Sequence, residues 1–449
     1  MGKFLNFKIS RKLFPFFTAL IIFIAFSGCA KEDVFQQQES SEPIQSIYET
    51  PENSSPSQEQ ILAIPSISDL SMLSDKNGLD LGCSTANGYY ELDISQNPAV
   101  LFYTDYATQQ RIPLCGRPEC THSDESCTAV IPGAEGIIHL DGKLFVFCMK
   151  QDGSLPVIKM NYDGSERETI FMLNSTDRYD KAFAGTQRSI FTVAEVYHPE
   201  TDKHVSELIM VDLQEGKIQT LTQLDNQGYW FLVGASGKYL LLKSIKQTGA
   251  APFGSPEAYA SQVHELFLYD VQQAFMTSIL SWTQGELLDV CYEDKLFLYN
   301  SSEATFSVQR FCADGLEPLL ISQPLPLQNA RDAFFYGLYD GRVVVEMGEN
   351  IVTEGNGSEY RWRMFAISTQ DGTVTELTLR QTYPSAGDFV RPLAESNGTL
   401  LVKYSVKEEL RTAEGQDGSL EQYQTYVPVY AMIDSADFFS NNPRFLVIA

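Results

Sequence analysis

The sequence predicts an all-β protein, a β-propeller of seven four-stranded blades, with six or eight blades as alternatives. Three observations lead to this fold class: apolar residues alternate with period two, short strands pair across Gly-containing turns, and pairs of such hairpins recur along the chain. Between Tyr89 and Val447, seven units average about 51 residues each, which lies within the range of four-stranded propeller blades. Two stacked β-sandwiches are the competing fold, because short strands with frequent turns also suit that architecture.

Each predicted unit begins with an inner hairpin of two apolar strands. The copies are Ile137–Phe147, Phe231–Leu242, Leu287–Tyr299, Phe334–Met347 and Val390–Tyr404. Their turns include Asp141-Gly142, Asp340-Gly341 and Asn397-Gly398, residue pairs that tolerate the positive φ of tight hairpin turns. The inner hairpins therefore predict paired strands with fixed register.

An outer hairpin follows each inner one. Its clearest copy is Pro156–Leu173, for which we predict a strand, a two-residue turn at Asp163-Gly164 and a second strand. Related copies are Glu207–Leu224, Phe306–Ser322 and Arg363–Leu379. Two hairpins cannot bury both of their faces alone, so we expect the units to stack radially around an axis.

The amino-terminal region predicts export and anchoring. A basic segment, Lys3–Lys12, precedes the apolar run Leu13–Phe26, which is too short to span a membrane and has the length of a secretory signal. The run ends at Ser27-Gly28-Cys29, which resembles the lipobox of bacterial lipoproteins. The resemblance implies lipidation of Cys29 and cleavage before it; an ordinary signal peptide with a chance cysteine is the alternative.

Three domains follow from this reading. Residues 1–28 are predicted to be a lipoprotein signal peptide, residues 29–60 the lipidated cysteine with a disordered polar tether, and residues 61–449 the propeller. The predicted location is the outer leaflet of a bacterial cytoplasmic membrane, with membrane contact through the lipid anchor alone. A formal net charge of −26 repels phosphate backbones, so nucleic acid is excluded as a partner.

A cysteine-rich stretch stands between the first two units. Cys115, Cys120, His122 and Cys127 follow the spacing C-x4-C-x-H-x4-C, and three thiolates with one imidazole can surround a tetrahedral zinc ion. Four protein ligands would leave no open position, so the predicted role is structural. Disulfides among Cys115, Cys120, Cys127 and Cys148 are the alternative in an exported protein, and free thiols are a third.

Long insertions mark a candidate binding face. Ile245–His264, Gly348–Arg361, Lys407–Gln424 and Leu114–Pro132 fall at links that share one face of a propeller. Their aromatic residues are suited to stacking on sugars or gripping a peptide: Phe253, Tyr259, Tyr360, Trp362, Tyr423 and Tyr426. Tolerated surface insertions that pack on themselves are the alternative.

These features favour a binding protein for an envelope protein, peptide or glycan over an enzyme. The sequence contains none of the common nucleotide-binding, hydrolase-elbow or zinc-protease motifs. A propeller-type glycan hydrolase or lyase, with carboxylates at the central channel, is one alternative. A structural or assembly role in the cell envelope is another.

The combined features resemble the propeller lipoproteins of Gram-positive anaerobes, which are similar to TolB-like and YWTD-type propellers. The most specific part of this resemblance is the segment with Leu114, Cys115, Pro118, Cys120, His122 and Cys127. A clean YWTD motif is absent. The resemblance covers the whole chain and implies no known activity.

Overall fold

The computed structural model divides the chain into two compact units, Met1–Leu62 and Ala63–Ala449, and the description below concerns the second. The structure describes residues 67, 69–74, 81–96, 98–150, 154–173, 178–179, 182–252, 254–327, 330–353, 357–382, 388–414 and 420–448. The predicted signal peptide, Cys29 and the tether lie outside these residues. No helix in the described part of the chain is long and apolar enough to cross a membrane.

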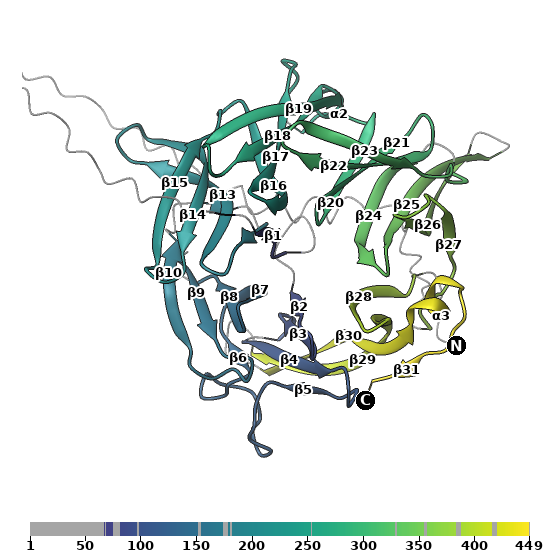
Figure 1. Ribbon diagram of the computed structural model, residues 1–449. Coiled ribbons are helices and arrows are strands. Elements are labelled where there is room, and N and C mark those ends of the chain that lie inside the picture. Colours follow the sequence, from purple (N-terminus) through teal and green to yellow (C-terminus); the bar gives the residue numbers. More distant parts are fainter. Residues whose placement is uncertain are drawn as a thin grey trace, which may run out of the picture. The chain divides into compact units, whose positions relative to one another are not determined.

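Antiparallel sheets arranged in a ring form this unit (Figure 1), which confirms the all-β propeller. The first sheet contains β2 (Gly82–Ser84), β3 (Gly88–Asp93), β4 (Ala99–Asp105), β5 (Arg111–Pro113) and β6 (Val130–Ile131). The second contains β7 (Ala134–Leu140), β8 (Lys143–Cys148), β9 (Leu155–Met160) and β10 (Glu168–Leu173).

The next sheet has ten strands. It contains β1 (Leu70–Met72), β11 (Arg178–Tyr179), β12 (Ala184–Gly185), β13 (Ser189–His198), β14 (Lys203–Asp212), β15 (Lys217–Gln223), β16 (Gly228–Gly237), β17 (Tyr239–Gln247), β18 (Gln262–Asp270) and β19 (Phe275–Thr283). The helix α2 (Pro256–Ala260) connects β17 to β18.

Three four-stranded sheets complete the ring. They are β20 (Leu287–Tyr292), β21 (Lys295–Asn300), β22 (Thr305–Cys312) and β23 (Gly315–Ile321); β24 (Ala330–Tyr339), β25 (Arg342–Thr353), β26 (Gly357–Ser368) and β27 (Val374–Leu377); and β28 (Arg391–Ser396), β29 (Thr399–Glu414), β30 (Leu420–Asp434) and β31 (Leu446–Val447). The helix α3 (Ser435–Phe439) follows β30.

Strand β1 explains why one sheet has ten strands. It pairs with β12 through Ser71 and Met72 and with β16 through Leu70 and Ser71, so it joins β12–β15 to β16–β19. Hydrogen bonding among the described strands therefore gives six sheets, and the predicted number of seven blades stays a prediction. Ile67 and Leu70 are buried in an apolar cluster, so this segment is anchored to the ring by side-chain packing as well as by the strand pairing of β1.

The predicted tight turns are confirmed in the inner hairpins. Asp141-Gly142, Asp340-Gly341 and Asn397-Gly398 are two-residue connections, and all six residues have positive φ between 45° and 75°. The turn of the outer hairpin was predicted wrongly. Residues 161–167 separate β9 from β10, and only Gly164 and Glu166 in this connection have positive φ, at 79° and 53°.

Seven clusters of buried apolar side chains hold the described part of the ring together. Each packs consecutive sets of strands against one another, as expected when the inner and outer hairpins stack radially. The ring closes where β28–β31 meets β2–β5, through Tyr430 and Met432 packed against Tyr89 and Tyr106. This closure uses side chains, because β31, from the carboxyl-terminal end of the chain, pairs with β30 of its own sheet.

Candidate functional site

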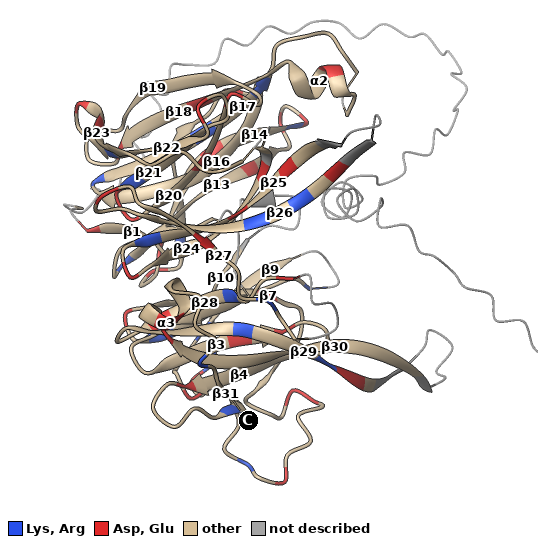
Figure 2. Cartoon of the chain, turned by 90° about the vertical axis from the view of Figure 1, so that its right-hand side faces the viewer, with Lys and Arg blue, Asp and Glu red and all other residues tan. Residues whose placement is uncertain are grey.

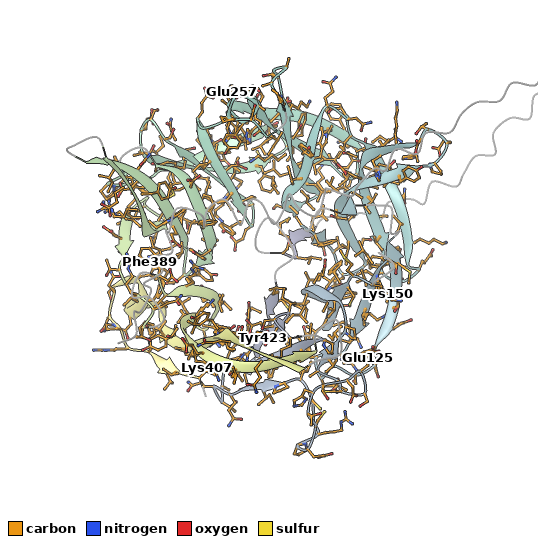
Figure 3. All side chains as sticks on the ribbon, turned by 180° about the vertical axis from the view of Figure 1, so that it is seen from behind. Glu125, Lys150, Glu257, Phe389, Lys407 and Tyr423 are labelled. Carbon is orange, nitrogen blue, oxygen red and sulfur yellow. The ribbon has the colours of Figure 1, made fainter. Side chains whose placement is uncertain are left out.

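The Cys/His stretch forms an insertion at the outer edge of the first sheet. Strands β5 and β6 both pair with β4, so they act as two halves of one edge strand. The segment Leu114–Ala129 lies between these two strands, and we call it the Cys/His lobe. The backbone of Leu101 accepts a bond from Leu114 N at 2.9 Å and donates one to Ala129 O at 2.7 Å. These two bonds close the neck of the lobe on a rigid strand. Glu125, within the lobe, lies at the outer edge of the ring in Figure 3.

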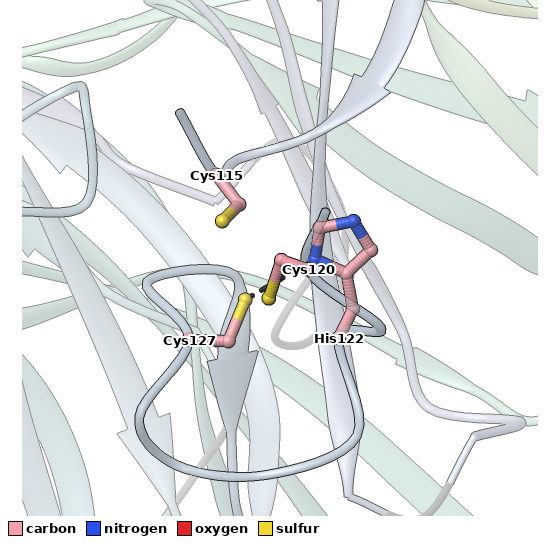
Figure 4. A group of neighbouring side chains, drawn as sticks. All are labelled: Cys115, Cys120, His122 and Cys127. Atoms are coloured by element: carbon pink, nitrogen blue, oxygen red, sulfur yellow. Dashed lines mark hydrogen bonds between the residues drawn. The ribbon is translucent and has the colours of Figure 1, made fainter. Parts of the chain in front are cut away.

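The lobe brings all four predicted metal ligands together (Figure 4). The sulfur atoms of Cys115, Cys120 and Cys127 and a ring nitrogen of His122 lie within 4.8 Å of one another. His122 Nδ1 lies 3.2 Å from Cys127 Sγ. Thiolates around a tetrahedral zinc ion lie about 3.7 Å apart, given Zn–S bonds of about 2.3 Å. The group therefore needs only a small contraction to hold a metal ion of that size.

Local turns place these side chains. His122 has a φ of 54°, in the left-handed region, which reverses the chain between Cys120 and Cys127. The Arg117 guanidinium donates to Ser126 O at 2.8 Å and to Cys120 Sγ at 3.5 Å, so it ties the two ends of the loop together. A cation beside the sulfur atoms also offsets part of the negative charge that three thiolates would carry.

Hydrogen bonds and burial act differently on the thiols. The backbone N–H of Arg117, which donates to the Cys115 sulfur, lowers the pKa of Cys115 to about 6. Burial raises the pKa of the Cys127 thiol, whose sulfur also accepts a bond from Ala129 N at 3.3 Å. Cys115 is thus favoured as a thiolate at neutral pH. Cys127 is held in an apolar environment, and a bound cation would offset the free-energy cost of ionising its thiol there.

The outer hairpin of the second sheet supports the lobe from the side. Gly164 packs so closely that a Cβ atom there would lie 2.9 Å from Thr128 O. The Arg167 guanidinium donates to the backbone carbonyls of Thr128 and Val130, the latter at 2.9 Å. Burial lowers the pKa of this arginine, and the neighbouring thiols of Cys127 and Cys148 oppose that shift. This contact could not be predicted from the sequence, because Arg167 is distant from the lobe along the chain.

The disulfide alternative stays untested. None of the seven described cysteines is in a disulfide, and Cys148 is not part of the four-residue group. Cys148 ends β8, and burial raises the pKa of its thiol to about 12. Cys83 and Cys291 are buried in strands, whereas Cys312 is half-buried.

The predicted binding face carries extended strands more than loops. Two of the predicted insertions, Gly348–Arg361 and Lys407–Gln424, are mostly the far ends of the β25–β26 and β29–β30 hairpins, which extend in the same direction in Figure 2. The helix α2 accounts for part of a third insertion. Glu257 on α2 and Tyr423 on β30 lie on opposite sides of the ring in Figure 3.

Several of the predicted aromatic residues lie close together on this face. Tyr360 and Trp362 of β26 pack against each other with ring centroids 5.4 Å apart, and Phe334 of β24 lies 5.0 Å from Trp362. Tyr259 interacts electrostatically with Asp332, to which Tyr360 donates a hydrogen bond. Tyr423 and Tyr426 are exposed on β30, and Phe253 lies outside the described residues.

A cavity of about 810 Å³ lies at the other end of the strands, near the short hairpin turns. Four carboxylates line it: Glu293, Asp294, Asp340 and Glu395. Each has a partner, since Lys295 pairs with the first two, Arg342 pairs with Asp340, and Glu395 accepts a bond from the Asp340 backbone. The glycosidase alternative requires a carboxylic acid and a carboxylate free to act on a substrate, which these pairings do not favour.

No protein-family model matches the sequence, and no curated protein matches it. Solved structures with a similar arrangement include oligogalacturonate lyase from Vibrio parahaemolyticus, with a TM-score of 0.44, 12% identity, and coverage of 79% of this chain and 90% of that one. TolB from Acinetobacter baumannii has a TM-score of 0.31 and 11% identity, with coverage of 81% and 77%. Acylaminoacyl peptidase from Pyrococcus horikoshii has a TM-score of 0.45 and 8% identity, with coverage of 83% and 52%. All three scores are below 0.5, so these likenesses carry nothing about the activity of this chain.

Proposed function

We propose that the chain is a lipid-anchored extracytoplasmic propeller that binds a protein, peptide or glycan of the cell envelope. The ligand contacts the face formed by α2 and the far ends of the β25–β26 and β29–β30 hairpins. The observation that carries this proposal is the exposure of large aromatic side chains there, among them Tyr259, Phe334, Tyr360 and Tyr426. Exposed aromatic groups on a rigid scaffold are typical of recognition surfaces.

The anchor in this proposal is a lipid on Cys29, followed by the polar tether of residues 29–60. A domain tethered to the outer leaflet of the cytoplasmic membrane lies next to envelope polymers and proteins. The acidic charge of the chain favours solubility there and disfavours nucleic acid. The propeller-type hydrolase or lyase and the envelope scaffold remain as alternatives, and no described contact favours either.

Retention on isolated, membrane-free cell-wall material tests the binding face. We expect the purified full chain to be retained, and the double variant Tyr360→Ala, Tyr426→Ala to lose most of that retention. Phe275→Ala is the matched control, because Phe275 is 62% exposed at the start of β19, beside a short turn at the other end of the strands. Equal retention of all three proteins, or no retention of the unaltered chain, would contradict the proposal.

We further infer that the Cys/His lobe holds one structural zinc ion. Cys115, Cys120, His122 and Cys127 supply four ligands of the kinds that zinc prefers, with no position open for a substrate. The ion would stabilise a segment that contributes few apolar side chains to the core.

Native mass spectrometry with thiol alkylation distinguishes zinc from disulfides. We expect one zinc ion per unaltered chain and none in Cys120→Ala. Cys312→Ala is the control, because Cys312 lies in β22, away from the lobe, and should keep the ion. Removal of the ion by a chelator should lower the melting temperature of the unaltered chain and leave that of Cys120→Ala unchanged. A mass loss of two hydrogens per bridge without metal would establish the disulfide alternative.

A further inference from the structure

We propose that Tyr259, Phe334, Tyr360 and Trp362, with Asp332 and Gln284, form a binding site for a neutral pyranose sugar; we call these six residues the aromatic platform. The proposal deepens the proposed function, on which it rests, by naming the ligand class and its place on the binding face. The platform is assembled from four segments: α2, the β19–β20 connection, β24 and β26.

The rings of the platform present faces to solvent. Phe334 is 54% exposed, Tyr360 is 44% exposed and Tyr259 is 58% exposed, while Trp362 is half-buried between the first two. Phe334 is tilted by 35° against Trp362, and Tyr360 meets Trp362 edge to face at 74°. Trp362 is therefore fixed by its neighbours, and a ligand that stacks here meets rings whose orientation is already set.

Glycine allows Tyr360 to lie across its own sheet. Gly348 stands opposite Trp362 on one side and Asp332 on the other, and a Cβ atom at Gly348 would lie 2.1 Å from the Tyr360 hydroxyl oxygen. Without a side chain at this position, the Tyr360 ring crosses β25 and its hydroxyl donates to Asp332 Oδ2. Any larger residue at position 348 would displace the ring.

A directed chain of hydrogen bonds fixes the polar groups. His264 is buried, and burial lowers its pKa, so its ring is neutral at pH 7. Its Nε2 contacts Gln284 Oε1, which requires that nitrogen to carry the hydrogen, and Gln284 Nε2 then donates to the Tyr259 hydroxyl at 2.5 Å. Because the Tyr259 oxygen accepts this bond, the hydroxyl hydrogen is not used in it and can be donated to a ligand.

These groups match the two chemical sides of a sugar ring. A pyranose has an apolar C–H face that stacks on an aromatic ring, and a rim of hydroxyls that both donate and accept hydrogen bonds. The platform offers exposed rings beside two bonded polar pairs: the Asp332 carboxylate accepts from Tyr360, and the Gln284 amide donates to the Tyr259 phenol. A protein partner would not require exposed rings beside fixed polar groups, because hot spots on protein interfaces are mainly buried aromatic and arginine anchors.

Charge narrows the sugar class. The carboxylate of Asp332 accepts a hydrogen bond from Tyr360 and interacts electrostatically with Tyr259. The arginines of β26 lie on its other face, where Arg361 pairs with Glu349 and Arg363 with Glu376. No cation pairs with Asp332 among the described side chains, so an anionic sugar would be repelled by this carboxylate, and neutral hexoses and N-acetylated hexosamines fit better.

Tryptophan fluorescence can report binding directly. The chain has three tryptophans, and Trp230 and Trp282 are only 5% and 4% exposed, so Trp362 is the one nearest to solvent. We expect a tetramer of β-1,4-linked N-acetylglucosamine or of glucose to change the emission of the full chain. Trp362→Phe should remove this response while calorimetry still detects binding, because phenylalanine keeps a stacking ring.

Calorimetry with the same tetramers tests the residues. Tyr360→Ala should weaken binding at least tenfold, equivalent to ~1.4 kcal/mol, and tetragalacturonate should bind at least tenfold more weakly than the neutral tetramers. Phe275→Ala, which removes an exposed ring at the other end of the strands, should bind within twofold of the unaltered chain. Equal affinity of Tyr360→Ala and the unaltered chain, or a preference for the anionic tetramer, would overturn the proposal.

The two proposals fail in different ways. If the unaltered chain is retained on cell-wall material but binds neither neutral tetramer, the glycan assignment is wrong and the face recognises a protein or peptide. If the unaltered chain is not retained and binds no tetramer, the proposed function itself fails, and this inference fails with it.

Discussion

The substitution Glu91→Ala should destabilise the propeller by ~3–5 kcal/mol, the range found when one partner of a buried ion pair is removed. Glu91 lies in β3, where its carboxylate accepts bonds from Arg111 at 2.8 Å and from the Tyr430 hydroxyl. The side chains of Glu91 and Arg111 are only 19% and 16% exposed. Without the carboxylate, the guanidinium stays beside the rings of Phe102 and Tyr430, and no other carboxylate among the described residues pairs with it.

The expected loss of stability is large because the contacts among Glu91, Arg111 and Tyr430 join the first sheet to the last one. Burial, and then the Glu91 carboxylate, raises the pKa of Tyr430 far above its usual value, so the hydroxyl keeps its hydrogen at neutral pH and donates it to the carboxylate. Tyr430 comes from β30 and Glu91 from β3, and no strand exchange links those two sheets among the described residues. The ring therefore depends on side chains for closure at this point.

Chemical denaturation of the variants measures the effect. Glu317→Ala is the control, because Glu317 pairs with Arg310 where both side chains are about half exposed, and it should cost at most ~1 kcal/mol. Glu91→Ala combined with Arg111→Met should be less unstable than the sum of the single variants, since the second change removes the unpaired charge. A loss below ~1 kcal/mol in Glu91→Ala would show that ring closure does not depend on this cluster.

The sequence was sufficient for the fold class because local signals agree with one another. Period-two alternation and Asp-Gly or Asn-Gly turns determine strands and register within each hairpin, and these predictions hold at Gly142, Gly341 and Gly398. The Asp163-Gly164 turn was predicted wrongly for a physical reason. The connection is longer than two residues, and a Cβ atom at Gly164 would lie 2.9 Å from Thr128 O, a close approach that no local pattern contains.

Sites that combine distant segments were harder to predict. The four ligands of the Cys/His lobe lie within thirteen residues, so spacing alone brought them together. Phe334 was predicted only as the first residue of an inner hairpin, and Asp332 was assigned no role. Their positions beside Trp362 and Tyr360 depend on pairing between β24, β25 and β26. Strand β1 was missed for a similar reason, because three residues with partners more than a hundred positions away leave no periodic signal.

The substitution Arg167→Ala should weaken zinc binding by 10- to 100-fold, although Arg167 is not a ligand. Groups that hold the backbone of a metal site in place commonly have effects of this size. Arg167 donates to the carbonyls of Thr128 and Val130, which follow the proposed ligand Cys127, and so fixes one end of the Cys/His lobe. Loss of these bonds to buried carbonyls should also lower the free energy of unfolding by ~1–3 kcal/mol.

Competition with a zinc-binding dye measures this affinity in the purified chain. Arg188→Ala is the matched control, because Arg188 is exposed and its guanidinium donates to Gln214 at 2.8 Å, away from the lobe, so its removal should leave zinc affinity unchanged. Arg167→Lys should give an intermediate affinity, since an ammonium group keeps the charge but cannot span both carbonyls as a planar guanidinium does. If Arg167→Ala loses stability while its zinc affinity equals that of Arg188→Ala, the arginine supports the sheet edge alone and the lobe organises its ligands by its own turns.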